Sequence, residues 1–358
     1  MGWQPSIVIV TAPTRYQGLM QRWGTRGQAR FRLNMAKQHA QEEVDAAASS
    51  SRSRRPPRTM PRSVNSEPPR SAAGAAAQAE AAFTQYEAEH RQYSVALEQL
   101  RAELELGFPV TLVERRYVPT YEFRNAMLVV VIGQDGLVAN TAKYVGDLPI
   151  IGVNPDPQRY DGVLLPYQVH QVRGAVESVL ADRAQLQLVT MAQARLNDGQ
   201  QILAFNDLFI GRRSHVSARY NLLTPRGSET QSSSGVIVAT GAGSTGWLSS
   251  IFNMMRGVVG WTGGTSGEPP RLQWHDRRLA WVVREPFASR HSQANLVAGM
   301  IDSGGELILE SLMPEGGAIF SDGIEDDYLE FNSGAIVHIG FAPHQAKIVV
   351  PVETGRRS

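Results

Sequence analysis

Cysteine is absent from this chain of 358 residues. Disulfide bonds and thiolate metal sites are therefore excluded. The eight histidines show no H-E-x-x-H or other metal-ligand spacing, and we expect no metal site built from protein side chains alone. Neither a G-x-S-x-G nucleophile elbow nor a G-x-x-x-x-G-K-[ST] phosphate loop occurs, so the sequence supports neither a hydrolase of that type nor a P-loop protein.

An excess of one charge is also lacking, because 35 Lys and Arg face 34 Asp and Glu for a formal net charge of +1. This balance argues against a general nucleic-acid binder. No apolar run approaches the roughly 18 residues that span a bilayer, so we expect no membrane partner. The N-terminus shows no signal-peptide pattern and enters an apolar run at Ile7 almost at once. We therefore expect a cytoplasmic protein.

The first part of the chain alternates between ordered and low-complexity segments. A strand is expected over Ser6 to Thr11 and a helix over residues 28–48. Residues 46–79 consist almost wholly of Ala, Ser, Pro and Arg, which bury too little apolar surface to fold, so we predict a disordered insertion there. Its arginines suit a solvated linker better than an RNA or acidic partner. Apolar and aromatic residues spaced three and four apart from Phe83 to Leu104 predict a helix.

The middle of the chain has the pattern of a βαβ unit. Met127 to Ile132 is a short β-branched run, typical of a strand buried on both faces of a parallel sheet. A Gly-rich turn follows, then an expected helix over residues 137–145 and a second buried strand over residues 148–153. A helix over residues 168–184 is expected to close this half.

Hydrophobicity then changes to a period of two. Asp198-Gly199 predicts a hairpin between the runs 186–189 and 201–211. Further strands are expected at residues 236–240, 279–284, 306–309 and 336–339, with one helix after Ser244. We predict an α/β N-terminal domain with a parallel sheet (residues 1–185), a β-rich C-terminal domain (residues 186–340), and a tail (residues 341–358) that returns to the first domain.

The turn Gly133-Gln134-Asp135-Gly136 ends the first buried strand of the βαβ unit. Open α/β sheets bind ligands at this position, where glycines let backbone N–H groups approach a phosphate. An aspartate there can orient a hydroxyl, accept its proton or hold Mg²⁺. The alternative is a tight turn in which Asp135 caps the next helix.

Two further motifs lie in the second half. Thr240-Gly241-Ala242-Gly243-Ser244-Thr245-Gly246 matches G-x-G-x-x-G, but no strand ending in an acidic residue follows, so a Rossmann dehydrogenase is disfavoured. Asn206-Asp207 interrupts an otherwise apolar strand expected over residues 202–210. At least one of the two polar side chains is therefore buried and needs a partner, which is either a ligand or an internal hydrogen bond.

Together and in this order, the motifs resemble those of NAD kinases. The run Val129 to Ala142 is similar to their Gly-Gly-Asp-Gly-Thr segment, Asn206-Asp207 to their Asn-Glu pair, and Thr240 to Trp247 to their Thr-Pro-Thr-Gly-Ser-Thr-Ala-Tyr segment. Finer details resemble the mitochondrial-type enzymes, namely Gly152 to Arg159, Phe209-Ile210-Gly211, Ser233-Ser234-Gly235, Arg284-Glu285-Pro286, Ser321-Asp322-Gly323 and Leu329-Glu330-Phe331.

The resemblance implies the two-domain architecture that NAD kinases share with diacylglycerol kinases, with the site in the cleft between the domains. It also implies a homodimer or higher homo-oligomer that uses ATP (or another phosphoryl donor) and Mg²⁺ to phosphorylate the 2′-hydroxyl of the adenosine ribose of NAD. Asp135 is the implied catalytic residue. The implied nucleotide-binding residues are Gly133, Gly136, Asn206, Asp207, Thr240, Gly241, Gly243, Ser244 and Thr245.

The chain departs from the family pattern at positions around the implied catalytic residue. Gln134 stands where the family has its second glycine, and Leu137 where it has a threonine. Both departures lie on the side of the phosphoryl donor. They keep two alternatives open, a non-catalytic NAD- or nucleotide-binding regulator and a kinase of the same fold acting on a lipid or sugar.

Overall fold

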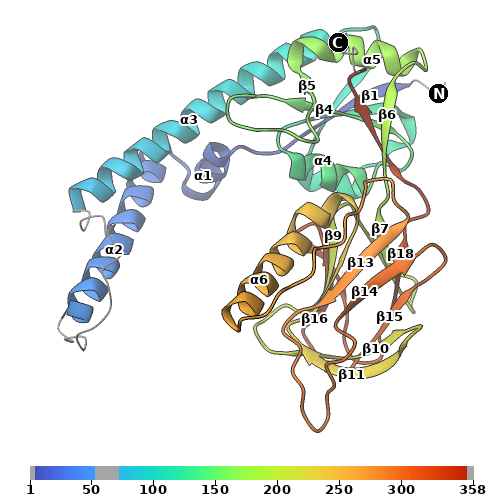
Figure 1. Cartoon of the computed structure of the whole chain (residues 1–358). Coiled ribbons are helices and arrows are strands. Elements are labelled where there is room, and N and C mark those ends of the chain that lie inside the picture. Colours follow the sequence, from blue (N-terminus) through green and yellow to red (C-terminus); the bar gives the residue numbers. More distant parts are fainter. Residues whose placement is uncertain (1–4, 53–71, 353–358) are drawn as a thin grey trace. The chain divides into compact units, whose positions relative to one another are not determined.

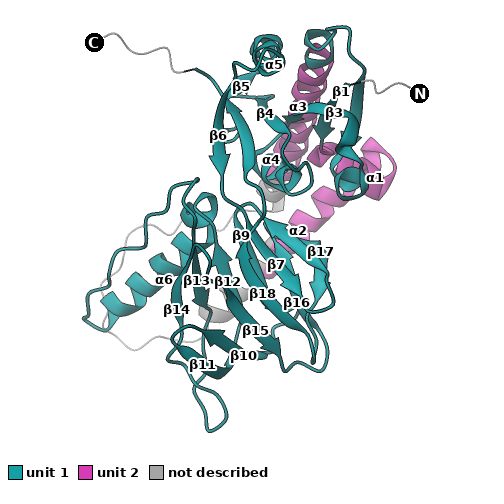
Figure 2. Cartoon of the chain, turned by 90° about the vertical axis from the view of Figure 1, so that its right-hand side faces the viewer, with its two compact units in different colours: residues 1–11, 100–358 teal, residues 12–99 magenta. Residues whose placement is uncertain are grey.

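The computed structural model describes residues 5–52 and 72–352. The chain divides into two compact units, residues 12–99 and residues 1–11 with 100–358, which are coloured separately in Figure 2. No helix in the described ranges is long and apolar enough to cross a membrane.

The described residues of the range 12–99 are largely helical. They contain α1 (Arg15–Trp23), α2 (Arg26–Arg52) and most of α3 (Ala72–Glu103). A capping box between Thr14 and Gln17 begins α1. The disordered insertion predicted for residues 46–79 is too wide at both ends. Its first residues, 46–52, continue α2, and its last residues, 72–79, belong to α3. Both stretches contain alanine, the best helix former. Its centre, residues 53–71, lies outside the described residues.

The other unit begins with a largely parallel sheet, seen around β1, β3 and β4 in Figure 1. The strand order is β2-β1-β3-β4-β19-β6, with β5 beside β4; β19 runs parallel to β4 and antiparallel to β6. Residues 7–10 of β1 and 128–132 of β3 are fully buried, as expected of continuous apolar runs in a parallel sheet. The elements of this layer are β1 (Ser6–Thr11), β2 (Val110–Glu114), β3 (Ala126–Ile132), α4 (Asp135–Ala142), β4 (Pro149–Asn154), β5 (Tyr167–Gln168), α5 (Val172–Leu180), β6 (Gln185–Val189) and β19 (Ala346–Val350).

Two antiparallel sheets of six strands follow, in the orders β11-β10-β15-β18-β7-β8 and β14-β13-β12-β9-β16-β17. Their inner faces share one apolar core that includes Tyr220 from the first sheet and Ile210 and Trp281 from the second. The helix α6 (Trp247–Trp261) packs on the outer face of the second sheet through Leu248. The strands are β7 (Ala192–Leu196), β8 (Gln201–Ala204), β9 (Asp207–Arg212), β10 (Ala218–Thr224), β11 (Gly227–Ser233), β12 (Val236–Ala239), β13 (Arg278–Val283), β14 (Ala298–Asp302), β15 (Leu307–Ser311), β16 (Gly317–Ser321), β17 (Ile324–Glu330) and β18 (Ile336–Phe341).

The predicted hairpin around Asp198-Gly199 exists, but its strands are β7 and β8. The run 186–189, predicted as one arm, belongs to β6 and pairs with β19 in the parallel-sheet layer. The run 201–211, predicted as one strand, is two strands separated at Phe205 and Asn206. The physical reason for this break is a carboxylate that binds the backbone N–H groups there, as the next subsection describes.

The predicted fold class is nevertheless confirmed. An α/β region with a mostly parallel sheet precedes an antiparallel β-rich region.

Candidate active site

The turn between β3 and α4 places Asp135 as the first residue of the helix. The N-cap residue is Gln134, which makes no side-chain capping bond, so Asp135 does not cap the helix. Its half-buried carboxylate instead accepts hydrogen bonds from the N–H of Leu164 at 2.8 Å and of Val163 at 3.3 Å. Asp135 therefore holds the loop that follows β4 against this turn.

The two glycines of the turn have different surroundings. A Cβ at Gly133 would lie 3.2 Å from Leu137 Cδ2, so the turn is packed on that side. A Cβ at Gly136 would meet no atom within 4 Å, and this residue is exposed. Of the predicted phosphate-facing glycines, Gly136 is thus the one whose backbone a ligand can approach.

The glycines of the second motif are needed for packing of backbone on backbone. A Cβ at Gly241 would lie 1.9 Å from the carbonyl oxygen of Gln273, and one at Gly243 would lie 2.0 Å from that of Asn206. Both distances are far below van der Waals contact. These two positions therefore require glycine before any ligand is considered, and Gly243 brings its motif against Asn206.

The hydroxyl groups of this motif are largely used within the protein. Thr240 is fully buried; its Oγ1 donates to the carbonyl of Phe205 at 2.6 Å and accepts from the N–H of Gly243 at 3.2 Å. Ser244 Oγ donates to the carbonyl of Gly241 at 2.7 Å. Thr245 is exposed. Thr240 and Ser244 thus shape the turn, whereas Thr245 faces solvent, where a ligand can reach its hydroxyl.

Three strand ends bring together Asn206, Asp207 and Thr240, which are among the implied nucleotide-binding residues. In the second antiparallel sheet, Ala239 at the end of β12 pairs with Asp207 at the start of β9, and the N–H of Thr240 donates to the carbonyl of Asn206 at 2.9 Å. The end of β16 lies on the other side of β9, where Ser321 pairs with Leu208. Residues more than 100 positions apart in the chain therefore meet at one edge.

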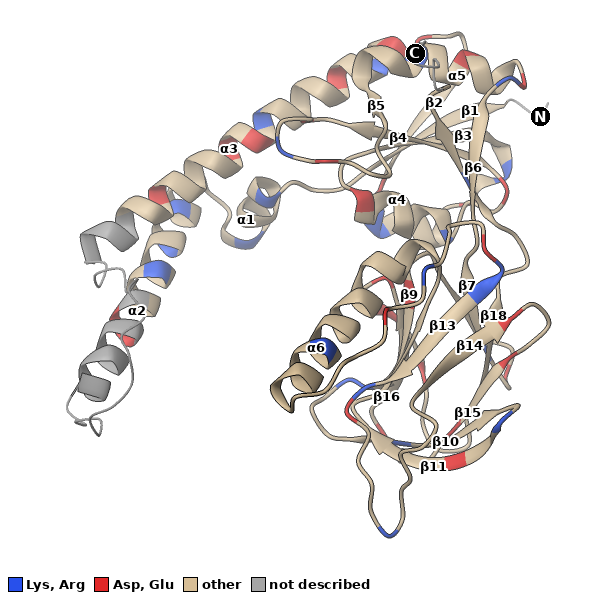
Figure 3. Cartoon of the chain, viewed as in Figure 1, with Lys and Arg blue, Asp and Glu red and all other residues tan. Residues whose placement is uncertain are grey.

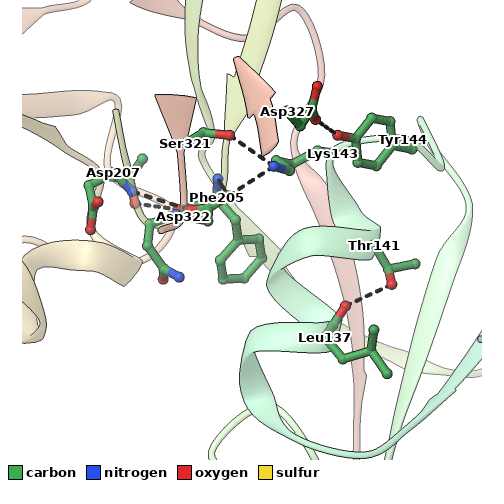
Figure 4. A network of polar contacts seen from close by, with 11 residues as sticks. Leu137, Thr141, Lys143, Tyr144, Phe205, Asp207, Ser321, Asp322 and Asp327 are labelled. Carbon is green, nitrogen blue, oxygen red and sulfur yellow. Dashed lines mark hydrogen bonds and ion pairs between the residues drawn. The ribbon is translucent and has the colours of Figure 1, made fainter. Parts of the chain in front are cut away.

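A residue without a predicted role organises this edge. The carboxylate of Asp322 accepts hydrogen bonds from three consecutive backbone N–H groups, those of Phe205 (3.1 Å), Asn206 (2.6 Å) and Asp207 (3.3 Å). Because these N–H groups bind a carboxylate and not a neighbouring strand, the chain is interrupted here, and β8 and β9 are separate strands. Figure 4 shows the carboxylate beside this segment. The only sequence signal was the Ser321-Asp322-Gly323 tripeptide.

Lys143 connects α4 to the same edge. It immediately follows the last helical residue, and its Nζ donates to Ser321 Oγ at 2.8 Å and lies 3.9 Å from Asp322 Oδ2 (Figure 4). The side chains of Lys143 and Asp322 are each 2% exposed. Burial lowers the pKa of Lys143 and raises the pKa of Asp322, while the attraction between the two charges opposes both changes.

Asp207 is a second buried carboxyl at this edge. It is 8% exposed. Burial, and secondarily the neighbouring Asp322, raises the pKa of Asp207 to about 7 from an ordinary value of 3.8. Near neutral pH this group therefore exchanges between an acceptor-only carboxylate and a carboxylic acid that also donates.

A cavity of about 400 Å³ lies on the outer face of the same sheet. Phe209, two residues beyond Asp207 on β9 and so on the same face, is stacked on Trp247 (ring centroids 5.8 Å apart, planes at 9°) and on Phe320 (4.7 Å, 29°). The cavity is also lined by three arginines, and Arg284 lies over the Trp247 ring at 5.4 Å. These arginines are Arg212, Arg213 and Arg284.

One cavity arginine has an unused donor. Among the described residues, Arg212 Nε is one of the few buried polar atoms that have no hydrogen-bond partner. A buried guanidinium N–H without a partner is costly and indicates a missing acceptor. The combination of stacked rings and arginines suits a flat ligand that carries negative charge.

No family model and no curated protein sequence matches the chain. Among solved structures, the crystal structure of yeast NADH kinase complexed with NADH is similar over 98% of this chain and 85% of the other, at 13% sequence identity and a TM-score of 0.50. A likeness at this identity shows the fold. The chain therefore has the two-domain fold of an NAD kinase, as the motifs predicted.

Proposed function

We propose that this protein is an NAD kinase, which transfers a phosphoryl group to the 2′-hydroxyl of the adenosine ribose of NAD, and that it resembles the mitochondrial type. The proposal includes ATP (or another phosphoryl donor), Mg²⁺, a homodimer or higher homo-oligomer, and the cytoplasm as the place of action. The observation that carries it is the meeting of Asn206, Asp207 and Thr240 at one strand edge, on the same sheet as a cavity of stacked rings and arginines that extends toward the other end of the strands.

The chemical groups of NAD, the proposed phosphoryl acceptor, match the side chains at this edge and in the cavity. A dinucleotide has flat bases for Phe209 and Trp247 and a diphosphate for the cavity arginines. Asn206 and Asp207 supply an amide and a carboxyl group able to bind ribose hydroxyls. The abundance of polar and charged groups favours such a substrate over a lipid.

Asp135 is proposed as the residue that orients the acceptor hydroxyl. Phosphoryl transfer passes through a loose transition state, so positioning and charge neutralisation contribute more than strong basicity. In this role the carboxylate would exchange one of its amide partners, the longer bond from Val163, for the acceptor hydroxyl. Mg²⁺ in such reactions is held largely by the phosphates with one or two carboxylates, and Asp135 is the carboxylate at this turn.

The two departures from the family pattern concern the donor side of the turn. Leu137 is 5% exposed and packs toward Gly133, so this position offers an apolar contact where the family has a hydroxyl. Gln134 is exposed and offers an amide. We therefore propose the donor class, a nucleoside triphosphate or another phosphoryl donor, rather than one donor.

The test is NADP formation by the purified protein with NAD, ATP and Mg²⁺, compared with Asp135→Asn. We expect turnover by the wild type and a fall of at least about 100-fold in kcat for the variant, because the group that orients the acceptor is changed. Asp147→Asn is the matched control, since Asp147 is 75% exposed in the same layer. A thermal melt of each variant checks that the fold is intact.

Two results would contradict the proposal. Failure of the wild type to form NADP from any donor, with NAD binding retained in calorimetry, would identify a non-catalytic NAD-binding regulator. Failure to bind NAD, with phosphorylation of a sugar or lipid instead, would identify a kinase of the same fold with another acceptor.

A further inference from the structure

The helix α4 has one functional candidate at each end. Asp135 is its first residue, and Lys143 immediately follows its last. At about 1.5 Å per residue the two residues are separated by about 12 Å along the helix axis. Because the helix connects the two residues, contacts that hold Lys143 in place also restrain the position of the Asp135 turn.

Lys143 is held by groups from the far side of the site. Its Nζ contacts Ser321 Oγ and approaches Asp322 Oδ2, and the Asp322 carboxylate in turn holds the N–H groups of residues 205–207. An unbroken chain of polar contacts thus runs from α4 to the backbone of Asn206 and Asp207, as Figure 4 shows. Every link in it is made by a side chain that is almost fully buried or by backbone.

Stability alone does not account for the buried pair of Lys143 and Asp322. A buried ion pair is commonly no more stabilising than an apolar pair of the same volume, because both charges lose their water. In some proteins the role of such a pair is instead to define one geometry, because separating a buried charge from its partner is strongly destabilising. With its side chain 2% exposed, Lys143 is also not accessible to a substrate phosphate.

We propose that Lys143 is a positioning residue, which acts through Ser321 and Asp322 to set the distance between the Asp135 turn and the Asn206–Asp207 backbone. The inference rests on the proposed function, because it assigns the two ends of the contact chain to the two halves of one reaction site. A misplacement of about 1 Å between reacting groups lowers turnover by about 100-fold, whereas the binding of NAD by residues 206 and 207 depends less on α4.

The experiment compares kcat and KM for NAD in three variants of the full-length protein. In Lys143→Met combined with Asp322→Asn, both charges are removed while side-chain volume is kept. The amide oxygen at position 322 still accepts from the N–H groups of Asn206 and Asp207, whereas the N–H of Phe205 loses its acceptor. We expect kcat to fall by about 10- to 100-fold with KM for NAD within about 3-fold of the wild type. In Lys143→Arg the guanidinium still reaches Ser321 and Asp322, and we expect at least about a third of the wild-type kcat.

Lys347→Met is the matched control and is expected to leave both constants unchanged, because Lys347 pairs with the exposed Asp147 on the surface of the same layer. The single variant Lys143→Met is not used, since it leaves Asp322 buried without its partner. Wild-type kcat in the folded double variant, or a similar loss in Lys143→Arg, would overturn the positioning role while leaving the NAD kinase proposal standing. Absence of NADP formation by the wild type would overturn both.

Discussion

Replacing Asp207 by asparagine should make the folded protein more stable at pH 8 but leave its stability at pH 4 almost unchanged. The carboxyl group is 8% exposed, and its folded-state pKa is about 7 against 3.8 for the ordinary group. Below pH 3.8 the carboxyl group is protonated in both the folded and the unfolded state, so its burial carries no cost of ionisation. Its ionisation then costs increasing free energy as the pH rises from 3.8 to about 7.

The size of the effect follows from these two values. At about 1.4 kcal/mol per pH unit, the difference between them corresponds to about 4 kcal/mol of unfolding free energy lost by the wild type between pH 4 and pH 8. The charged group that raises the pKa of Asp207 is Asp322, which is itself paired with Lys143. Asparagine has the same shape and cannot ionise, so it relieves this cost.

Urea unfolding at pH 4, 6 and 8, extrapolated linearly to water, measures the difference between the variant and the wild type at each pH. The control is Asp198→Asn, because two contacts from Gln200 lower the pKa of the exposed Asp198 and its contribution therefore has the opposite pH dependence. A stability difference between Asp207→Asn and the wild type that is the same at pH 4 and pH 8 would refute the reasoning.

Two further substitutions test the packing of the site. Gly243→Ala places a methyl group 2.0 Å from the carbonyl oxygen of Asn206, so we expect a lower melting temperature and at least about 10-fold weaker NAD binding. The control is Gly257→Ala, where a Cβ meets nothing within 4 Å. Equal effects of the two substitutions would contradict the steric argument. Trp247→Ala removes the stack on Phe209 and the contact with Arg284, and we expect roughly 5- to 30-fold weaker NAD binding in calorimetry. Trp261→Ala, 86% exposed on the same helix, should bind NAD like the wild type, and parity between the two tryptophan variants would show that the cavity does not hold NAD.

Local sequence patterns were sufficient for the central strands of the parallel-sheet layer. The run at Ile7 and the run Met127 to Ile132 are short, continuous and β-branched, and only burial on both faces of a sheet accommodates such runs. The Gly-rich turn then predicted a ligand edge at Asp135. The same logic failed for the run 201–211, because a local pattern does not show that Asp322, more than 100 residues away, removes the N–H groups of residues 205–207 from the strand.

The charge distribution gives a similar contrast. In Figure 3, α6 carries little charge along its length, which the sequence Trp247 to Trp261 with its single arginine already indicates. The gathering of Arg212, Arg213 and Arg284 around one cavity follows only from the pairing of β9 with β12 and of β12 with β13. Sequence order places these residues up to 72 positions apart.

The sequence by itself predicted the fold class, the central strands of the parallel sheet and the candidate residues, since each depends on the hydrophobic period, on turn chemistry or on a motif read along a few residues. Tertiary structure alone decided which of those candidates meet. Asn206, Asp207 and Thr240 come together because antiparallel pairing places three strand ends at one edge. It also decided that Lys143 and Asp322 belong to this edge, because a buried charge is informative only when its partner in space is known.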